Sequence, residues 1–231
     1  MIHEAGPEHV PHLPPATHGA AYRLRRLLQQ PHKKTSDWYV TTGTFPAHAP
    51  NAERPNLFRA GCVVLDCDLA DYQAATVDPA HFDVAAKAAK PVLHALDADA
   101  LHALIDQHAA FVNAWSASLA GQPPTVTVSS GYGVHAYFWL HDDQGYGADV
   151  ETARQVNKAF VERLNAAVGF RLADPQASDC GTRILRIPGT HNTKNPAIPR
   201  QVRILNGDVN RRFDLYGFDP RHAFGQRVAF P

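Results

Sequence analysis

Hydrophobic residues recur with two different periods along the chain, and the period indicates the type of each element. Apolar residues three or four positions apart predict helices over about 20–30, within 81–120 as one or two helices, and over 149–168. β-Branched and aromatic runs predict strands over 37–45, 62–68, 125–129, 134–140, 184–187, 201–205 and 212–216. The segment 46–60 contains three prolines and is expected to be a loop. This order of elements predicts an α+β fold with a mixed or antiparallel sheet flanked by helices.

The length of the chain suits one domain. Its 231 residues are 45% hydrophobic, so we expect a single domain over 1–231, with a flexible arm over the Pro- and His-rich residues 1–17. The N-terminus lacks the pattern of a signal peptide, and no apolar run approaches the roughly 20 residues of a membrane span. The three cysteines are widely spaced and predict no disulfide framework. We therefore expect a cytoplasmic protein that has no membrane partner.

The net charge does not point to a partner. Lys plus Arg and Asp plus Glu both number 22, so the chain carries no bulk basic charge. Neutrality is typical of many soluble proteins, but it is also compatible with a basic groove beside an acidic site, because the two cancel in the sum.

Two acids stand at the end of an apolar strand, in the segment VVLDCD. Asp66 and Asp68 are two residues apart, so on a strand both carboxylates lie on one face. Like charges held this close favour a divalent cation between them, and Mg²⁺ or Mn²⁺ prefers oxygen ligands. The alternative is that these residues cap a turn.

A glycine-rich turn joins the two strands predicted over 125–129 and 134–140. The segment SSGYGVH places Ser130 and His135 on either side of Gly131 and Gly133. Paired glycines permit a tight turn and leave backbone N–H groups open to a phosphate. The alternative is an ordinary hairpin with a histidine on its solvent face.

A third acid precedes a strand that carries two arginines. Asp179 is followed by Arg183, Arg186 and then the polar turn PGTHNTK, which ends at Lys194. An arginine within an apolar strand needs a partner, and carboxylate or phosphate is the usual one. The alternative is that these arginines form internal ion pairs.

The three motifs, in this order, resemble the primase-polymerase (PrimPol) branch of the archaeo-eukaryotic primase superfamily, which plasmids, phages and mobile elements carry. They are VVLDCD, SSGYGVH and ASDCGTRILRIPGTHNTK, they lie within 62–194, and the resemblance spans roughly 37–205. It implies an RRM-like catalytic core fused to an N-terminal α/β module. It also implies a template-dependent nucleotidyltransferase that joins dNTPs or NTPs and releases pyrophosphate during replication of such an element.

The resemblance assigns roles to individual residues. It implies two divalent ions, Mg²⁺ or Mn²⁺, held by Asp66, Asp68 and Asp179. It implies that the nucleotide is bound by the hairpin and the basic residues, namely Ser130, Gly131, Gly133, His135, Arg183, Arg186 and Lys194. No cysteine lies between Cys67 and Cys180, so we expect no structural zinc.

The expected partners are a single-stranded DNA template with its primer, dNTP or NTP, and a replicative helicase. Many members of the branch continue into a helicase; this sequence stops at Pro231, which predicts a free-standing enzyme or a fragment. A template needs a basic track outside the acidic pocket. The candidates for it are Arg23, Arg25, Arg26, Lys33, Lys34, Arg200, Arg203, Arg211 and Arg212.

Two other functions compete with this one. A replication-initiator nuclease would need two histidines flanking an apolar residue, whereas His135 is followed by Ala136 and Tyr137. A non-catalytic module that binds single-stranded nucleic acid or nucleotide would not need all three acids, which this chain has. Incorporation of labelled nucleotides separates these possibilities.

Overall fold

The computed structural model describes residues 2–4, 38–41, 43–44, 59–141, 150–178 and 184–219. The helix expected over 20–30 and most of the loop expected over 46–60 lie outside these residues. Within the segment expected to be an arm, Ile2–Glu4 forms a strand, β1, which pairs with β2 (Trp38–Thr41). The strand expected over 37–45 is described as two short strands, β2 and β3 (Gly43–Thr44).

The centre of the fold is a four-stranded antiparallel sheet with the strand order β11-β6-β7-β5. Its strands are β5 (Cys62–Asp68), β6 (Val126–Ser129), β7 (Gly133–Trp139) and β11 (Arg203–Gly207). Strands β6 and β7 form the hairpin that the sequence predicts, and β5 pairs with β7 along its whole length. The coarse expectation of an α+β fold with an antiparallel sheet is therefore confirmed, while the RRM-like detail and the N-terminal module stay predictions.

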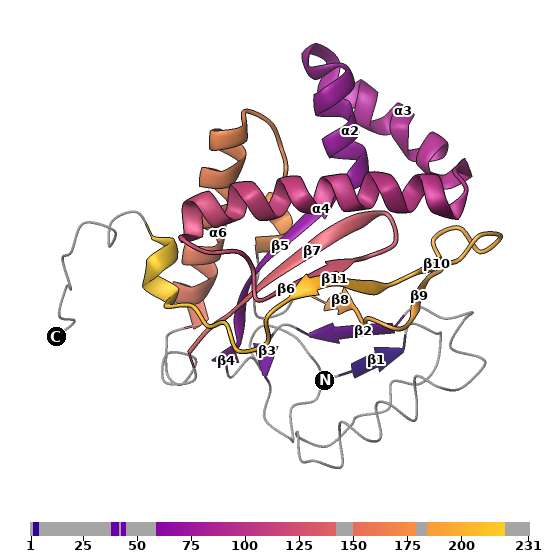
Figure 1. The fold of residues 1–231 in the computed structure, drawn as a ribbon. Helices are drawn as coiled ribbons and strands as arrows, with labels where there is room; N and C mark the ends of the chain where they lie inside the picture. Colours follow the sequence, from indigo (N-terminus) through magenta and orange to yellow (C-terminus); the bar gives the residue numbers. More distant parts are fainter. Residues whose placement is uncertain are drawn as a thin grey trace, which may run out of the picture.

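In the described part of the chain, four α-helices accompany this sheet: α2 (Leu69–Val77), α3 (Phe82–Ala95), α4 (Ala98–Ala120) and α6 (Val150–Val168). Figure 1 shows α4 lying across the strands on one side of the sheet, with α2 and α3 near one end of it and β1 and β2 on the opposite side of the sheet. Asp97 starts α4 by accepting a hydrogen bond from the Ala100 N–H. No helix in the described part of the chain is both long enough and apolar enough to cross a membrane.

The two faces of the sheet have different neighbours because side chains alternate along each strand. Leu65 and Phe138 point to the helical side and join the main core, which includes Ile105 of α4 and Phe160 of α6. Phe138 meets Phe160 edge-to-face at a centroid distance of 5.5 Å, a favoured aromatic geometry. The acids of β5 alternate with these core residues, so they face the other side of the sheet.

The edge of β5 that does not pair with β7 is covered by α6. Asn157 is fully buried; its Oδ1 accepts from the Val64 N–H at 2.6 Å and its Nδ2 donates to the Val64 carbonyl at 3.1 Å. One residue pair further along, the Asp174 N–H donates to the Asp66 carbonyl at 2.9 Å. These bonds satisfy backbone groups that an edge strand would otherwise leave open, and they fix the position of the acidic strand.

Smaller strand pairs complete the fold. Strand β8 (Ile184–Arg186) pairs with β2, and β4 (Arg59–Ala60) pairs with β3. Two strands of two residues each, β9 (His191–Asn192) and β10 (Arg200–Gln201), pair as a small antiparallel hairpin. The described residues also form three short 3₁₀ turns, which are η3 (Pro79–His81) between α2 and α3, η4 (Pro175–Ser178) after α6, and η5 (Leu215–Phe218) near the end of the described residues.

Two predictions about elements were wrong. The strand expected over 212–216 is an isolated bridge at Phe213 followed by η5, because Asp214 accepts a hydrogen bond from the Tyr216 N–H and starts the 3₁₀ turn. The strand expected over 201–205 is divided between β10 and β11. The break falls at Val202, because the Val202 N–H donates to the Thr190 carbonyl. In addition, α2 was not predicted.

Candidate active site

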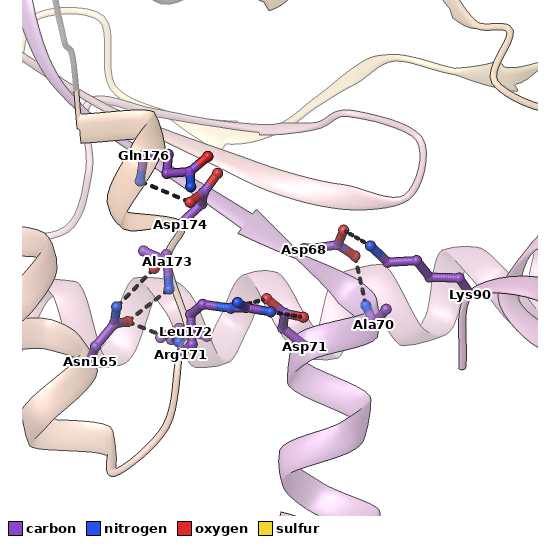
Figure 2. Close-up of polar contacts among 10 residues, drawn as sticks. All are labelled: Asp68, Ala70, Asp71, Lys90, Asn165, Arg171, Leu172, Ala173, Asp174 and Gln176. Carbon is purple, nitrogen blue, oxygen red and sulfur yellow. Dashed lines mark hydrogen bonds and ion pairs between the residues drawn. The ribbon is translucent and has the colours of Figure 1, made fainter. Parts of the chain in front are cut away.

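The two acids of β5 lie where that strand meets α2. Asp66 and Asp68 share the face of β5 opposite the helices, as their spacing predicts. Asp68 also caps α2, because its Oδ1 accepts from the Ala70 N–H at 2.9 Å, and its Oδ2 lies 3.6 Å from the Lys90 ammonium of α3 (Figure 2). The capping role was the alternative for this pair, and for Asp68 it is correct.

The histidine of the hairpin faces the first of these acids. In the β5–β7 register Asp66 is opposite His135 and Asp68 is opposite Gly133. The His135 Nε2 is 3.5 Å from the Asp66 Oδ1, and the histidine side chain is almost fully buried while that of Asp66 is one-quarter exposed. Two motifs distant in the sequence thus meet through one cross-strand pair.

The glycines of the hairpin allow its loop to pack closely. A Cβ at Gly133 would collide with the Cys67 carbonyl oxygen, so only glycine lets β7 begin this close to the acids. Gly131 has a φ of +98°. The Ser130 N–H donates to the Gly133 carbonyl at 2.9 Å and the Gly131 N–H donates to the Ser129 hydroxyl at 3.3 Å. The loop therefore uses these two N–H groups internally, whereas the sequence suggested that they would be open to a phosphate.

A segment after α6 brings a further acid, Asp174, to the site. Two contacts hold this segment (Figure 2). The Asn165 Oδ1 accepts from the backbone N–H groups of Leu172 and Ala173, both at 2.9 Å. The Arg171 side chain forms a bidentate pair with Asp71 of α2. The Asp174 Oδ1 accepts from the Gln176 N–H, which orients the carboxylate (Figure 2).

The basic side of the site comes from β8 and the turn that follows it. Arg186 is buried at the end of β8, and Lys194 is exposed two residues after β9. Asn192 lies between the turn and the hairpin: its Nδ2 donates to the Ser130 carbonyl at 2.8 Å and its Oδ1 accepts from the Lys194 N–H at 3.0 Å.

One cavity of about 380 Å³ collects these groups. Its lining residues are Asp66, Cys67, Asp68, Ser130, Tyr132, Gly133, His135, Asp174, Leu185, Arg186, Asn192 and Lys194. Seven of the predicted site residues are among them, and Gly131 lies behind the lining in the loop. Asp179 and Arg183 lie outside the described residues, so their roles stay predictions.

Three polar residues of the lining were not predicted from the sequence: Tyr132, Asp174 and Asn192. Tyr132 sits between the two glycines of the hairpin, and its ring packs 4.3 Å from that of His94. Asn192 lies inside the turn PGTHNTK, so its motif position was a signal, but its contact with Ser130 is visible only in the fold. For Asp174 the sequence held no signal beyond an Asp-Pro pair.

The thiol in the lining is not a candidate nucleophile. Burial, and after it the charges of Asp66, Asp71 and Asp68, raise the pKa of Cys67 well above its usual value. A thiol must be a thiolate to act as a nucleophile or a metal ligand. Cys67 is therefore neutral, and it belongs to the core beneath the cavity.

The four described arginines proposed for a template track are occupied elsewhere. Arg200 is buried against Tyr132 and Leu96, and Arg203 pairs with Asp106 at 3.1 Å. Arg211 donates to the Pro124 carbonyl at 2.7 Å, and Arg212 lies over the Trp139 ring at 5.0 Å. The buried position of Arg200 excludes it from an exposed track; the other five candidates lie outside the described residues.

The donor set around β5 suits a hard divalent cation, because Asp66 and Asp68 present carboxylate oxygens to one cavity. Within the described ranges, however, no group of three or more His, Cys, Asp or Glu side chains is arranged to hold a metal ion. Asp66 and Asp68 both line the cavity, while Asp179 is not described, so the metal site stays a prediction.

Comparison with known proteins gives similar structures but no similar sequence. The sequence matches no family model and no curated protein. The fold is similar to the AEP domain of the cyanophage S-2L primase-polymerase, with a TM-score of 0.45 and 16% identity over 88% of this chain and 76% of that one. It is also similar to the primase RepB′, with a TM-score of 0.42 and 15% identity over 86% of this chain and 47% of that one.

A third similar structure is the catalytic domain of primase RepB′ in complex with initiator DNA. Its TM-score is 0.43 with 15% identity, over 94% of this chain and 78% of that one. These structural neighbours are an AEP domain of a primase-polymerase and a primase. Because every TM-score is below 0.5, the functional proposal rests on the cavity and the motifs instead.

Proposed function

We propose that this chain is a template-dependent nucleotidyltransferase of the DNA primase or DNA polymerase type. The observation that carries the proposal is the single cavity in which acids of β5, the serine and histidine of the hairpin, and the basic residues of the third motif meet. Each motif alone has an ordinary structural explanation. Their convergence gives the carboxylates, the hydroxyl and the cations that transfer of a nucleotide requires.

The basic and hydroxyl groups of the cavity would bind the triphosphate. Arg186 offers a planar fork of donors for phosphate oxygens, and the exposed ammonium of Lys194 can follow the charge of the phosphates. Ser130 and His135 also line the cavity, and their hydroxyl and imidazole can donate to the same group. The nucleotide would therefore lie between the hairpin and the turn after β9.

The acids would act on the reacting end of the nucleotide. A divalent cation held by Asp66, Asp68 and Asp179 would neutralise charge on the phosphates. The chain's own contribution is to place these carboxylates: β7 and Asn157 fix the strand, and the cross-strand His135 orients Asp66. In the reaction a hydroxyl oxygen bonds to the α-phosphorus, the bond to the β-phosphate oxygen breaks, pyrophosphate leaves and the hydroxyl proton passes to water.

The proposal includes the partners and the setting implied by the motifs. They are a primed single-stranded DNA template, dNTP or NTP as substrate, and a helicase, within the replication of a plasmid, phage or mobile element. The chain would act as one catalytic domain over 1–231. A basic track for the template would not use Arg200, Arg203, Arg211 or Arg212, because these four arginines contact other groups.

A primer-extension assay tests the proposal. The protein is incubated with a primed template, one labelled dNTP and either Mg²⁺ or Mn²⁺, and an aliquot is treated with a chelator. We expect extension by the wild-type protein, none with the chelator, and none by a variant carrying both Asp66→Asn and Asp68→Asn. Nucleotide binding without extension by the wild-type protein would instead favour a non-catalytic nucleotide-binding module.

A further inference from the structure

A small hairpin supports the nucleotide side of the cavity. Strands β9 and β10 share the cross-strand pair Asn192–Arg200, and both of these residues are buried. Asn192 donates to the Ser130 carbonyl at 2.8 Å, while Arg200 Nε donates to the Tyr132 hydroxyl at 3.4 Å. Both members of the pair thus contact the 130–133 loop, one on each side of Gly131.

The close approach of the two hairpins depends on Gly131. A Cβ at this position would lie 2.8 Å from the Asn192 Cβ and 3.1 Å from the Arg200 Cβ, distances at which a side chain must shift. The loop and the β9–β10 hairpin are therefore in direct contact over Gly131, and Asn192 occupies the space that a side chain would take.

The second hydrogen bond of Asn192 extends this contact to the basic turn. Its Oδ1 accepts from the Lys194 N–H at 3.0 Å, two residues ahead, which is the pattern of an Asx-turn. This bond sets the direction in which the chain leaves β9 and so where the Lys194 side chain starts. The amide of Asn192 joins the two walls of the cavity, each through one hydrogen bond.

We propose that Asn192 is a positioning residue that fixes the separation between Ser130 and Lys194 and thereby sets the affinity of the cavity for the triphosphate. This inference rests on the proposed function. Asn192 acts through its two neighbours, since the fixed wall is what lets a hydroxyl and an ammonium engage one polyphosphate together. Without the amide, each wall keeps its groups but loses its position relative to the other, so binding weakens more than the chemical step.

The chain offers a matched control, Thr125, the residue just before β6. Thr125 is also fully buried and also makes one donated and one accepted hydrogen bond, to the Arg211 carbonyl at 3.1 Å and from the Trp139 N–H at 2.9 Å. It is absent from the lining of the cavity. The variants Asn192→Ala and Thr125→Val therefore remove comparable buried bonds at two places, and only the first lies between the walls.

The test combines steady-state incorporation with calorimetric binding of a dNTP in the presence of Mn²⁺. For Asn192→Ala we expect KM and Kd for the dNTP to rise about tenfold or more, with kcat changed less than about threefold, because displaced Ser130 and Lys194 make weaker contacts with the charged ligand, and this acts on binding. For Thr125→Val we expect a lower Tm with KM and Kd within about twofold of the wild type. Equal KM values in Asn192→Ala and the wild type would overturn the inference.

A second variant separates the two bonds and remains informative if Asn192→Ala does not fold. In Asn192→Ser the hydroxyl can still accept from the Lys194 N–H but is too short to reach the Ser130 carbonyl. We expect an intermediate rise in KM, and an unchanged KM would overturn the inference. A wild-type protein that neither binds nor incorporates nucleotide would instead overturn the proposed function, so the two failures are distinguishable.

Discussion

Asp66 and His135 face each other across the β5–β7 pair, with the His135 Nε2 3.5 Å from the Asp66 Oδ1. This side-chain contact links the acidic strand to the histidine of the hairpin. In the same strand register Asp68 is opposite Gly133. Because side chains two residues apart share a face, both acids point toward the same cavity.

Replacing Asp66 by asparagine should stop nucleotide incorporation without unfolding the protein. The substitution keeps the shape of the side chain and removes the charge that the site is built to present. We expect incorporation to fall by about a hundredfold or more, the scale seen when one preorganised electrostatic group is lost. Rates of primer extension and thermal unfolding measure the two effects. Asp106→Asn, on the exposed side of α4, is the control and should leave the rate unchanged; equal rates in both variants would contradict the role of Asp66.

Removing the histidine of the hairpin should weaken nucleotide binding far more than template binding. His135 lines the cavity beside Ser130, and a hydrogen bond to a charged phosphate is worth about 1.5–3 kcal/mol, or roughly a ten- to hundredfold change in Kd. For His135→Ala we expect a rise of this size in the Kd for dNTP, measured by calorimetry, with little change for single-stranded DNA. The control is His81→Ala on an exposed turn. An unaltered dNTP affinity would reduce the hairpin to a structural element.

A methyl group at Gly133 should destabilise the fold. The added Cβ would collide with the Cys67 carbonyl oxygen, so β7 must move away from the acidic strand. Overpacking of this kind costs about 1–3 kcal/mol of unfolding free energy. Gly217→Ala is the matched control, because nothing lies within 4 Å of a Cβ there. Denaturant unfolding compares the two variants, and equal midpoints would show that the strands are not in close contact at this point.

Stability should fall with decreasing pH because of His108. Burial lowers the pKa of this histidine from 6.5 to about 3, and its ring stacks on that of Tyr72 at 4.8 Å. No described residue gives either ring nitrogen a hydrogen-bond partner. The folded state thus keeps the ring neutral between pH 6.5 and about 3, whereas the unfolded state takes up a proton below 6.5. The contribution of His108 to the unfolding free energy is therefore fully present above pH 6.5. It is lost as the pH falls below 6.5, by up to about 1.4 kcal/mol per pH unit.

His108→Phe tests this explanation, because it keeps the stacking and removes the titrating group. Between pH 7 and pH 5 we expect the unfolding free energy of the wild type to fall by about 2 kcal/mol more than that of this variant, measured by denaturant unfolding. Parallel pH profiles of the two proteins would show that the histidine does not titrate between the two states.

The acidic strand and the hairpin could be predicted from the sequence because each is a local pattern. One pattern is an apolar run that ends in two acids, and the other is a pair of strands joined by SGYG. Each lies within a short stretch of sequence and predicts its own local geometry. The helix α2 was missed because Asp68 serves both as the last residue of β5 and as the N-cap of that helix, so the change of period falls within one residue. The strand expected over 212–216 failed for a similar reason, since Asp214 turns the chain where alternation suggested that it continues.

The residues that the sequence missed at the site owe their position to distant contacts. Asp174 reaches the cavity because Asn165 and the edge of β5 hold the segment before it, and Asn192 because its amide meets the Ser130 carbonyl. Conversely, Arg200 was expected to face a template, but its guanidinium packs on Tyr132 in the core. No local pattern distinguishes such an arginine from an exposed one.

The central claim is that a template directs this chain to join nucleotides at the cavity of Asp66 and His135. The most direct measurement offers a primed template with a defined next base and each of the four dNTPs in turn, in the presence of Mg²⁺ or Mn²⁺. The account predicts that the wild-type protein adds the complementary nucleotide in preference to the other three and that Asp66→Asn adds none. Addition that ignores the template base, or that persists in Asp66→Asn, would contradict it.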